Sequence, residues 1–112
     1  MSSNKQITST VTDAGKLEIA ITESERPIPG DDEVLIQIEA TPINPSDLGL
    51  LIGPGDINTL KAEDSKIIMD VPKAIMGAMK PRLNKPMPVG NEGSGVVIEA
   101  GANAQELMGK VV

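Results

Sequence analysis

Three stretches of the chain alternate apolar and polar residues with the two-residue period of a β-strand, and this alternation constrains the fold more than any other feature. The stretches cover residues 7–11, 17–21 and 34–40, so each strand would bury one face and expose the other. Residues 13–16, which include Gly15, lie between the first two stretches and are typical of a turn. This pattern predicts a β-hairpin followed by a third strand.

The chain contains no Phe, Tyr, Trp, Cys or His, so its core must consist of Ile, Leu, Val, Ala and the six Met residues. Hydrolases with a Ser-His-Asp triad and ordinary zinc sites are excluded, because they need an imidazole or a thiolate. The net charge of −6 also disfavours nucleic acid as a partner, since a phosphate backbone binds cations. At 112 residues we expect one domain.

The apolar runs are only a few residues long, and the N-terminal region is polar as far as Lys16. A membrane-spanning helix needs about 20 apolar residues, and a signal peptide needs an apolar core. We therefore expect no membrane partner and no signal peptide, with a cytoplasmic location by default.

A short helix is expected directly after the third alternating stretch. Asn44 is a good N-cap, Pro45 fits the first helical position, and Asp47 places a negative charge in the first turn, where it favours the helix dipole. Residues 48–52 supply its apolar part, and the Gly-Pro-Gly sequence at residues 53–55 should end it.

Less regular patterns follow in the middle of the chain. Asp56 is expected to cap a second short turn reaching toward Lys61, and residues 61–66 are expected to be exposed. Residues 70–80 have apolar side chains at four-residue spacing, which predicts a second helix ended by Pro81. This Met-bearing segment either packs over the rest of the fold or forms a flexible wall of a substrate pocket.

Residues 90–95 are rich in glycine and lead directly into a strand of small and β-branched residues at 96–101. A glycine-rich phosphate cradle works through the amides of a helix N-terminus, and no helix is expected here. A phosphate-binding loop also fails at Gly109 and Lys110, because Val111 follows where Ser or Thr is required. We therefore interpret the glycines as allowing close backbone passage at a corner.

The chain resembles the medium-chain dehydrogenase/reductase superfamily, particularly its zinc-independent quinone oxidoreductase branch. The segments that carry this resemblance are Asn44-Pro45-Ser46-Asp47, Gly90-Asn91-Glu92-Gly93-Ser94-Gly95-Val96-Val97, and the strand-like stretches 29–36 and 109–112. The resemblance implies a mainly β fold with short helices (α+β), a partial GroES-like β-barrel spanning residues 1–112.

The resemblance also implies a function. In zinc-dependent members, Cys and His ligands stand at the positions that match Asn44 and Asn91, so no catalytic metal is expected. The family places a Rossmann cofactor domain after this region, and the 112 residues contain none. The chain would then be an N-terminal catalytic-domain fragment of a zinc-independent, NADPH-dependent oxidoreductase acting on a quinone or an activated carbonyl or alkene. Alone, it is expected to bind neither NADPH nor a small-molecule substrate and to be inactive.

The family's cleft implies a substrate and cofactor site of Asn44, Ser46, Asp47, Asn91 and Glu92. Asn44 would hydrogen-bond the nicotinamide carboxamide or the substrate carbonyl, and Ser46 would donate to a developing oxyanion. Asn91 offers a donor and an acceptor, and Glu92 would relay a proton. Purely structural alternatives are helix capping by Asn44 and Asp47, and a corner fixed by backbone amides that donate to Glu92.

A second reading makes the chain a stand-alone GroES-like binding or assembly module without catalysis. An incomplete barrel would leave strand edges near Val111 and Val112 unpaired, and such edges recruit another chain, which predicts a homo-oligomer. The acidic residues 31–33 are interpreted as a solvated loop cluster, with cation binding as the alternative.

Overall fold

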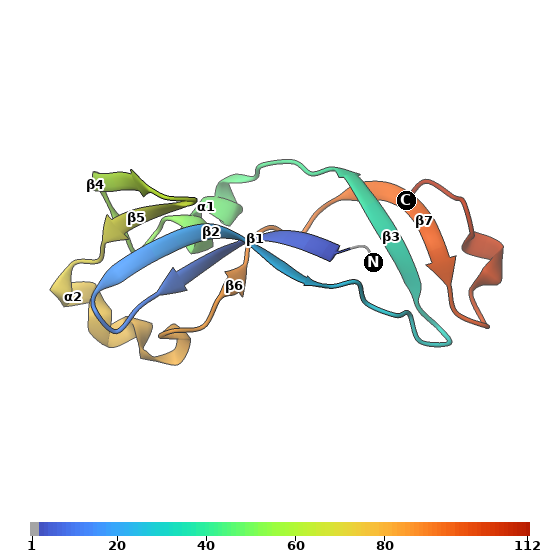
Figure 1. The fold of residues 1–112 in the computed structure, drawn as a ribbon, viewed down its shortest axis with the longest axis horizontal. Helices are drawn as coiled ribbons and strands as arrows, with labels where there is room; N and C mark the ends of the chain where they lie inside the picture. The colour runs from blue at the N-terminus through green and yellow to red at the C-terminus, as the bar shows by residue number, and fades with distance from the viewer. Residues whose placement is uncertain (1–2) are drawn as a thin grey trace. The chain divides into compact units, whose positions relative to one another are not determined.

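The computed structural model describes residues 3–112 and is mainly β with short helices (Figure 1). This confirms the predicted fold class, a partial GroES-like barrel. The contacts divide the described residues into two compact units. The first unit contains Ser3–Ser24 and Asn44–Val89, and the second contains Glu25–Ile43 and Gly90–Val112.

The first unit is built on a five-stranded sheet with the strand order β4-β5-β2-β1-β6. A tight turn joins β1 to β2: the Thr12 N–H donates to the Lys16 carbonyl at 2.8 Å, and Gly15 adopts a φ of +77°. The predicted hairpin is therefore confirmed, with Gly15 at a position that favours glycine. The strands are β1 (Ser3–Val11), β2 (Lys16–Glu25), β4 (Asp56–Glu63), β5 (Lys66–Asp70) and β6 (Met87–Pro88).

Asp56 caps locally as predicted, since its Oδ1 accepts from the Asn58 N–H at 3.0 Å, but the predicted turn reaching toward Lys61 is wrong, because this segment forms the β4–β5 hairpin. Lys61 pairs with Ile68 and Glu63 with Lys66, across a turn in which Asp64 has a φ of +54°. β5 is itself held by β2, so pairing with a strand distant in sequence decides this segment, not the local helical preference. Residues 61–65 are exposed, as predicted, whereas Lys66, also predicted to be exposed, is half-buried and pairs with Glu18.

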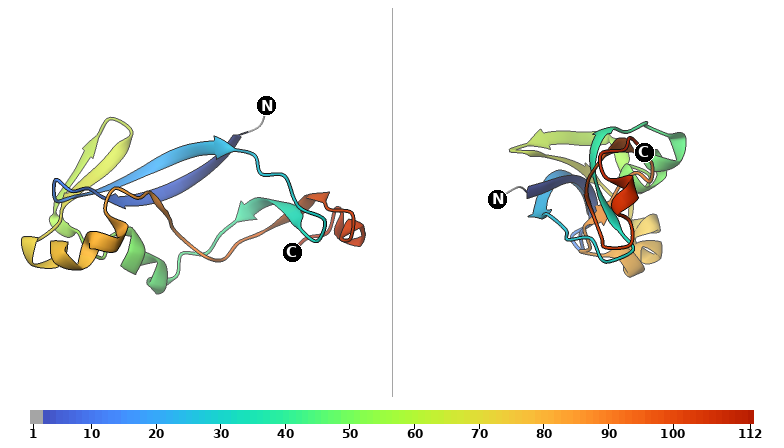
Figure 2. Two further views of the ribbon diagram at one scale, coloured as in Figure 1. Left: turned by 90° about the horizontal axis from the view of Figure 1, so that it is seen from below. Right: turned by 90° about the vertical axis from the view of Figure 1, so that its right-hand side faces the viewer.

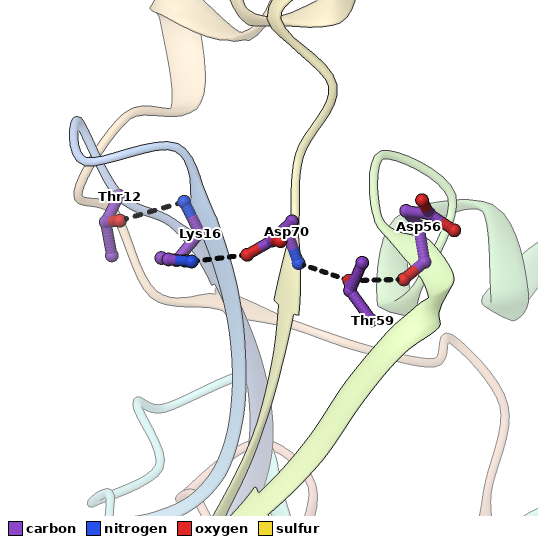
Figure 3. A network of polar contacts seen from close by, with 5 residues as sticks. All are labelled: Thr12, Lys16, Asp56, Thr59 and Asp70. Atoms are coloured by element: carbon purple, nitrogen blue, oxygen red, sulfur yellow. Dashed lines mark hydrogen bonds and ion pairs between the residues drawn. The ribbon is translucent and has the colours of Figure 1, made fainter.

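A chain of polar contacts fixes the irregular start of β4 (Figure 3). The Thr59 hydroxyl donates to the Asp56 carbonyl at 2.7 Å and accepts from the Asp70 N–H at 2.8 Å. The Asp70 carboxylate pairs with the Lys16 ammonium, and the Lys16 N–H donates to the Thr12 hydroxyl at 3.2 Å. The pairing of β4 with β5 is interrupted between Asp56 and Lys61. In this interval, these bonds link both strands to the β1–β2 turn.

The predicted second helix begins later and ends later than the sequence suggested. Helix α2 (Lys73–Met76) continues as the 3-10 helix η1 (Gly77–Arg82), whereas Asp70 belongs to β5. Pro72 precedes the helix in an extended conformation, with a ψ of 139°. Pro81 does not end the helix, because a proline removes only its own N–H and the Leu83 N–H still reaches the Lys80 carbonyl at 3.4 Å.

The core of the first unit is small and aliphatic. Val11, Leu17 and Met69 are fully buried, and Leu17 lies directly opposite Met69 in the β2–β5 ladder. The α2–η1 segment lies beside the β1–β2 turn (Figure 2), and its side chains Met76 and Met79 pack against this core. These contacts favour the interpretation of a packed segment over a flexible pocket wall.

The second unit is an antiparallel pair of β3 (Val34–Ala40) and β7 (Ser94–Ala100), followed by the 3-10 helix η2 (Gln105–Leu107). β3 has the bounds that the alternation predicted. The last residues add to the free side of β7: the Val112 N–H donates to the Gly95 carbonyl at 2.9 Å, and the Gly95 N–H donates back at 3.0 Å. The expectation of unpaired edges near Val112 is thus wrong for the side that faces β7.

The loop before β3 satisfies its carboxylates locally. The Gly30 N–H donates to Glu33 Oε1 at 2.7 Å, and Asn103 Nδ2 donates to Asp32 Oδ1 at 2.9 Å. The Asn103 N–H also donates to the Asp31 carbonyl at 2.8 Å. These bonds agree with the interpretation of residues 31–33 as an exposed loop cluster. No helix within residues 3–112 has the length and apolar character needed to cross a membrane.

Candidate functional site

The first group of predicted site residues lies at the start of helix α1 (Pro45–Leu51), in the first unit. Asn44 is the N-cap, with φ −94° and ψ 150°, and its N–H donates to Asp47 Oδ2 at 2.9 Å. The two residues form a capping box, as the sequence predicted. Ser46 is exposed in the first turn, so its hydroxyl is accessible to solvent or to a ligand.

Removing the cap carboxylate should weaken the first unit. Asp47→Ala is expected to lower the free energy of unfolding by about 1 kcal/mol, because the Asn44 N–H loses its acceptor and the helix loses a favourable charge. Urea titration followed by far-UV circular dichroism measures this loss. Ser46→Ala, in the same turn, is the matched control and should change stability by less than about 0.5 kcal/mol. An equal cost for the two variants would contradict the capping role of Asp47.

The second group of predicted site residues lies in the second unit, at an open pocket beside the end of β3 and the start of β7. Gly90 precedes this group with a φ of +90°, a conformation that glycine adopts without strain. Asn91 and Glu92 are exposed and line the pocket. The full lining is Ala40, Thr41, Pro42, Asn91, Glu92, Gly93 and Ser94.

The glycines of this group allow β7 to approach β3 closely. A Cβ atom built on Gly95 would lie 2.0 Å from the Gln37 carbonyl oxygen, closer than any side chain can pack. A Cβ on Gly93 would lie 3.1 Å from Ile38 Cδ1. The structure therefore supports the interpretation that these glycines permit close backbone passage, and the segment leads into a strand and not into a helix.

The pocket is lined by groups that recognise polar ligands and by one ionisable side chain. The Asn91 amide both donates and accepts hydrogen bonds, the hydroxyls of Thr41 and Ser94 do the same, and Glu92 supplies a carboxylate. Sequence reasoning did not single out Thr41 and Ser94. Their positions in the sequence could have identified them, since Thr41 directly follows β3 and Ser94 is the first residue of β7.

The residues present do not fit a zinc ion. Zinc sites in proteins use thiolate, imidazole and carboxylate ligands, and the chain has neither Cys nor His. Asn44 and Asn91 offer only neutral amide oxygens, which are weak ligands for this metal. Among residues 3–112, no three acidic side chains lie close enough together to hold a metal ion.

Comparison with protein families agrees with this fold. Residues 30–112 match the model of the alcohol dehydrogenase GroES-like domain. The chain therefore belongs to this family, which is part of the medium-chain dehydrogenase/reductase superfamily. A search of the curated proteins finds no match.

The five predicted site residues fall into two groups, each described within its own unit. Asn44, Ser46 and Asp47 share the start of α1, and Asn91 and Glu92 share the β7 pocket. That the two groups form a single site stays a prediction.

Proposed function

We propose that this chain is the GroES-like portion of a zinc-independent, NADPH-dependent oxidoreductase that reduces a quinone or an activated carbonyl or alkene. The carrying observation is that residues 30–112 match the alcohol dehydrogenase GroES-like domain. The resemblance described for the sequence implies that Asn44 and Asn91 stand where zinc-dependent members have their metal ligands. The complete lack of Cys and His in the sequence supports the same reading.

The class of substrate follows from the lack of zinc ligands. A zinc ion would act as a Lewis acid on an unreactive carbonyl, and hydrogen-bond donors polarise a carbonyl less strongly. A site without a metal therefore favours a substrate that is itself strongly electrophilic. Quinones and conjugated carbonyls meet this condition, because conjugation spreads the incoming negative charge.

The fit of the chain to NADPH is partial. The amides of Asn44 and Asn91 suit the nicotinamide carboxamide, which has one acceptor and two donor hydrogens. The described helices α1 and α2 have seven and four residues, and neither follows the glycine-rich segment. The pyrophosphate of the cofactor would thus need a nucleotide-binding domain in addition to these residues. When bound, the reduced nicotinamide supplies the hydride.

Each site residue then has a distinct role. Asn44 and Asn91 orient the carboxamide or the substrate carbonyl, which reduces the entropy cost of reaching the reactive geometry. The Ser46 hydroxyl donates to the oxygen that gains negative charge, and Glu92 relays a proton to or from solvent. Asp47 keeps Asn44 and Ser46 in place through the capping box.

The test is a titration of the ¹⁵N-labelled chain with reduced nicotinamide mononucleotide and with a water-soluble benzoquinone, in separate experiments. The side-chain amide signals of Asn44 and Asn91 are expected to shift weakly at millimolar ligand without reaching saturation, because these residues alone make too few contacts to hold a ligand. Asn84 and Asn103 are matched internal controls, since their amides already donate to Asp13 and Asp32. Their signals should not move.

Two results would overturn the proposal. Equal shifts of all four asparagine signals would show non-specific contact, and shifts of none would remove the site. A companion titration with NADPH, followed by the fluorescence of the reduced cofactor, should show no saturable binding below millimolar concentration. Tighter binding would show that these residues hold the nucleotide without a further domain.

The strand edge formed by the last residues favours the second reading, an assembly module. Val112 pairs with Gly95, while the Val111 side chain is 76% exposed. Val111→Lys should lower the association constant of the chain at least ~5-fold in sedimentation equilibrium, because edge lysines oppose strand pairing. Ile7→Lys, at an exposed position of β1, is the control. A monomeric parent chain would contradict the module reading.

A further inference from the structure

The cations of the protein are distributed unevenly. Four of its ten Lys and Arg residues lie between Val71 and Asn91, a segment without any of the sixteen Asp and Glu residues. Four of the other six cations form ion pairs. Within residues 3–112, none of the four cations of this segment pairs with a carboxylate. They are Lys73, Lys80, Arg82 and Lys85.

Three of these cations lie on a compact double turn, residues 80–85, which we call the basic turn. The Leu83 N–H donates to the Lys80 carbonyl at 3.4 Å, and the Lys85 N–H donates to the Arg82 carbonyl at 3.2 Å. The three cations therefore lie within six consecutive residues of a segment that reverses direction twice. Asn84, at the centre of the second reversal, has a φ of +58°.

The basic turn is anchored to the sheet of the first unit. The Asn84 N–H donates to the Val11 carbonyl at 2.7 Å, and the Asn84 side chain exchanges hydrogen bonds with Asp13 at 3.2 and 3.3 Å. Within residues 3–112, Asp13 is the carboxylate that forms hydrogen bonds with the basic turn, and it is bound by the Asn84 amide and not by a cation. One such carboxylate against three cations leaves the turn with a surplus of positive charge.

Within residues 3–112, the Arg82 side chain donates to neutral groups of the sheet and not to a carboxylate. Its Nη2 donates to Ser9 Oγ at 3.2 Å and to the Ser9 carbonyl at 3.4 Å, so both acceptors are neutral. Its Nε is buried without a hydrogen-bond partner. Burial also lowers the pKa of the guanidinium, by removing water from the charged form. A partly desolvated, unpaired cation attracts an anion more strongly than a fully hydrated one.

We propose that the basic turn binds a phosphate group, through Lys80, Arg82 and Lys85. Three cations held on a rigid turn suit the compact double charge of a phosphate better than the spread charge of an extended acidic peptide. The phosphate could belong to a nucleotide or to a phosphorylated substrate, and both present the same group. The site is independent of Asn44, Asn91 and the other residues of the proposed function.

The test is a titration of the ¹⁵N-labelled chain with inorganic pyrophosphate at low ionic strength. Saturable shifts are expected for the backbone amides of residues 80–85 and for the Arg82 Nε–H signal. The double variant Lys80→Gln with Lys85→Gln should weaken binding about 5- to 10-fold, because two exposed charge contacts are lost. Both lysines are exposed, so the fold should tolerate their replacement.

The matched control is the double variant Lys61→Gln with Lys73→Gln, which removes the same charge from exposed, unpaired lysines of the same unit. It should change the affinity less than about twofold. An equal loss in both double variants would overturn the proposal, because it would show only general attraction to positive charge. Tighter binding of a hexaglutamate peptide than of pyrophosphate would also overturn it, in favour of an acidic protein segment.

A comparison of adenosine 2′,5′-bisphosphate with pyrophosphate distinguishes a nucleotide from a phosphorylated substrate as the source of the phosphate. Adenosine 2′,5′-bisphosphate that binds at least ~10-fold more tightly than pyrophosphate would support a nucleotide at this site. Equal affinities would support recognition of the phosphate group alone, as expected for a phosphorylated substrate.

Discussion

Replacing Gly95 with alanine is expected to destabilise the second unit by about 3 kcal/mol, the upper range for an overpacked site. The new Cβ would lie 2.0 Å from the Gln37 carbonyl oxygen and 2.9 Å from the Ile38 Cα, and both are backbone atoms of the paired strand. A flexible side chain could move aside, but these atoms can move only if β3 separates from β7. Gly95 also exchanges two hydrogen bonds with Val112, so the pairing of the last residues with β7 should be lost as well.

Far-UV circular dichroism during urea titration measures this effect, because the chain has no aromatic residue to serve as a fluorescent probe. Gly49→Ala is the control: apart from its chain neighbours and the backbone of its own helix, a Cβ at this position of α1 meets no atom within 4 Å. That variant should be neutral or more stable by up to about 1 kcal/mol, since alanine favours the helix. A Gly95→Ala chain as stable as its parent would show that the β3–β7 approach is not as close as described.

Local patterns in the sequence were sufficient for several elements. β3 has the predicted bounds because its alternation is regular and its ends carry loop residues. Helix α1 begins where the Asn44–Asp47 capping signals place it, since capping depends on neighbours within one turn. The glycine-rich segment was also interpreted correctly, because a strand of β-branched residues follows it directly.

The β4–β5 hairpin could not be predicted in the same way. Residues 61–66 are polar on both faces and show no alternation, so the local pattern carries no strand signal. Residues 61–63 and Lys66 become strand, with a turn between them, because Ile67 and Met69 of β5 pair with β2, about 50 residues earlier in the chain. The expected helix at 70–80 lost Asp70 to this strand, a case in which tertiary pairing overrides local preference.

One part of the candidate site could be predicted from neighbouring residues, and the other part depends on segments far apart in the sequence. The roles of Asn44 and Asp47 at the helix start follow from neighbouring residues, and the structure reproduces them. The pocket around Asn91 needs Ala40, Thr41 and Pro42 from a strand end about 50 residues away, and no local signal connects these segments. The phosphate site proposed on the basic turn likewise depends on Ser9 and Asp13, far from it in sequence.

Leu17→Ala is expected to remove about 3 kcal/mol from the stability of the first unit, within the range measured for large-to-small core substitutions. The Leu17 side chain is fully buried opposite Met69, and a Cβ on Gly55 would lie only 3.0 Å from its Cδ2 atom. Because the neighbours include backbone at Gly55 and a fully buried Met69, the site can collapse only in part, and a cavity should remain.

This loss matters because the core of the first unit contains few fully buried side chains and no ring that could compensate. A small domain with 5–15 kcal/mol of stability, the usual range, would lose a large share of it. Urea titration with residue-resolved NMR signals from both units should show the first unit of the variant unfolding at a lower denaturant concentration than in the parent chain. Ile21→Ala, on the same strand at 67% exposure, is the control and should cost less than about 1 kcal/mol. Equal losses for Leu17 and Ile21 would place the core elsewhere than around Val11, Leu17 and Met69.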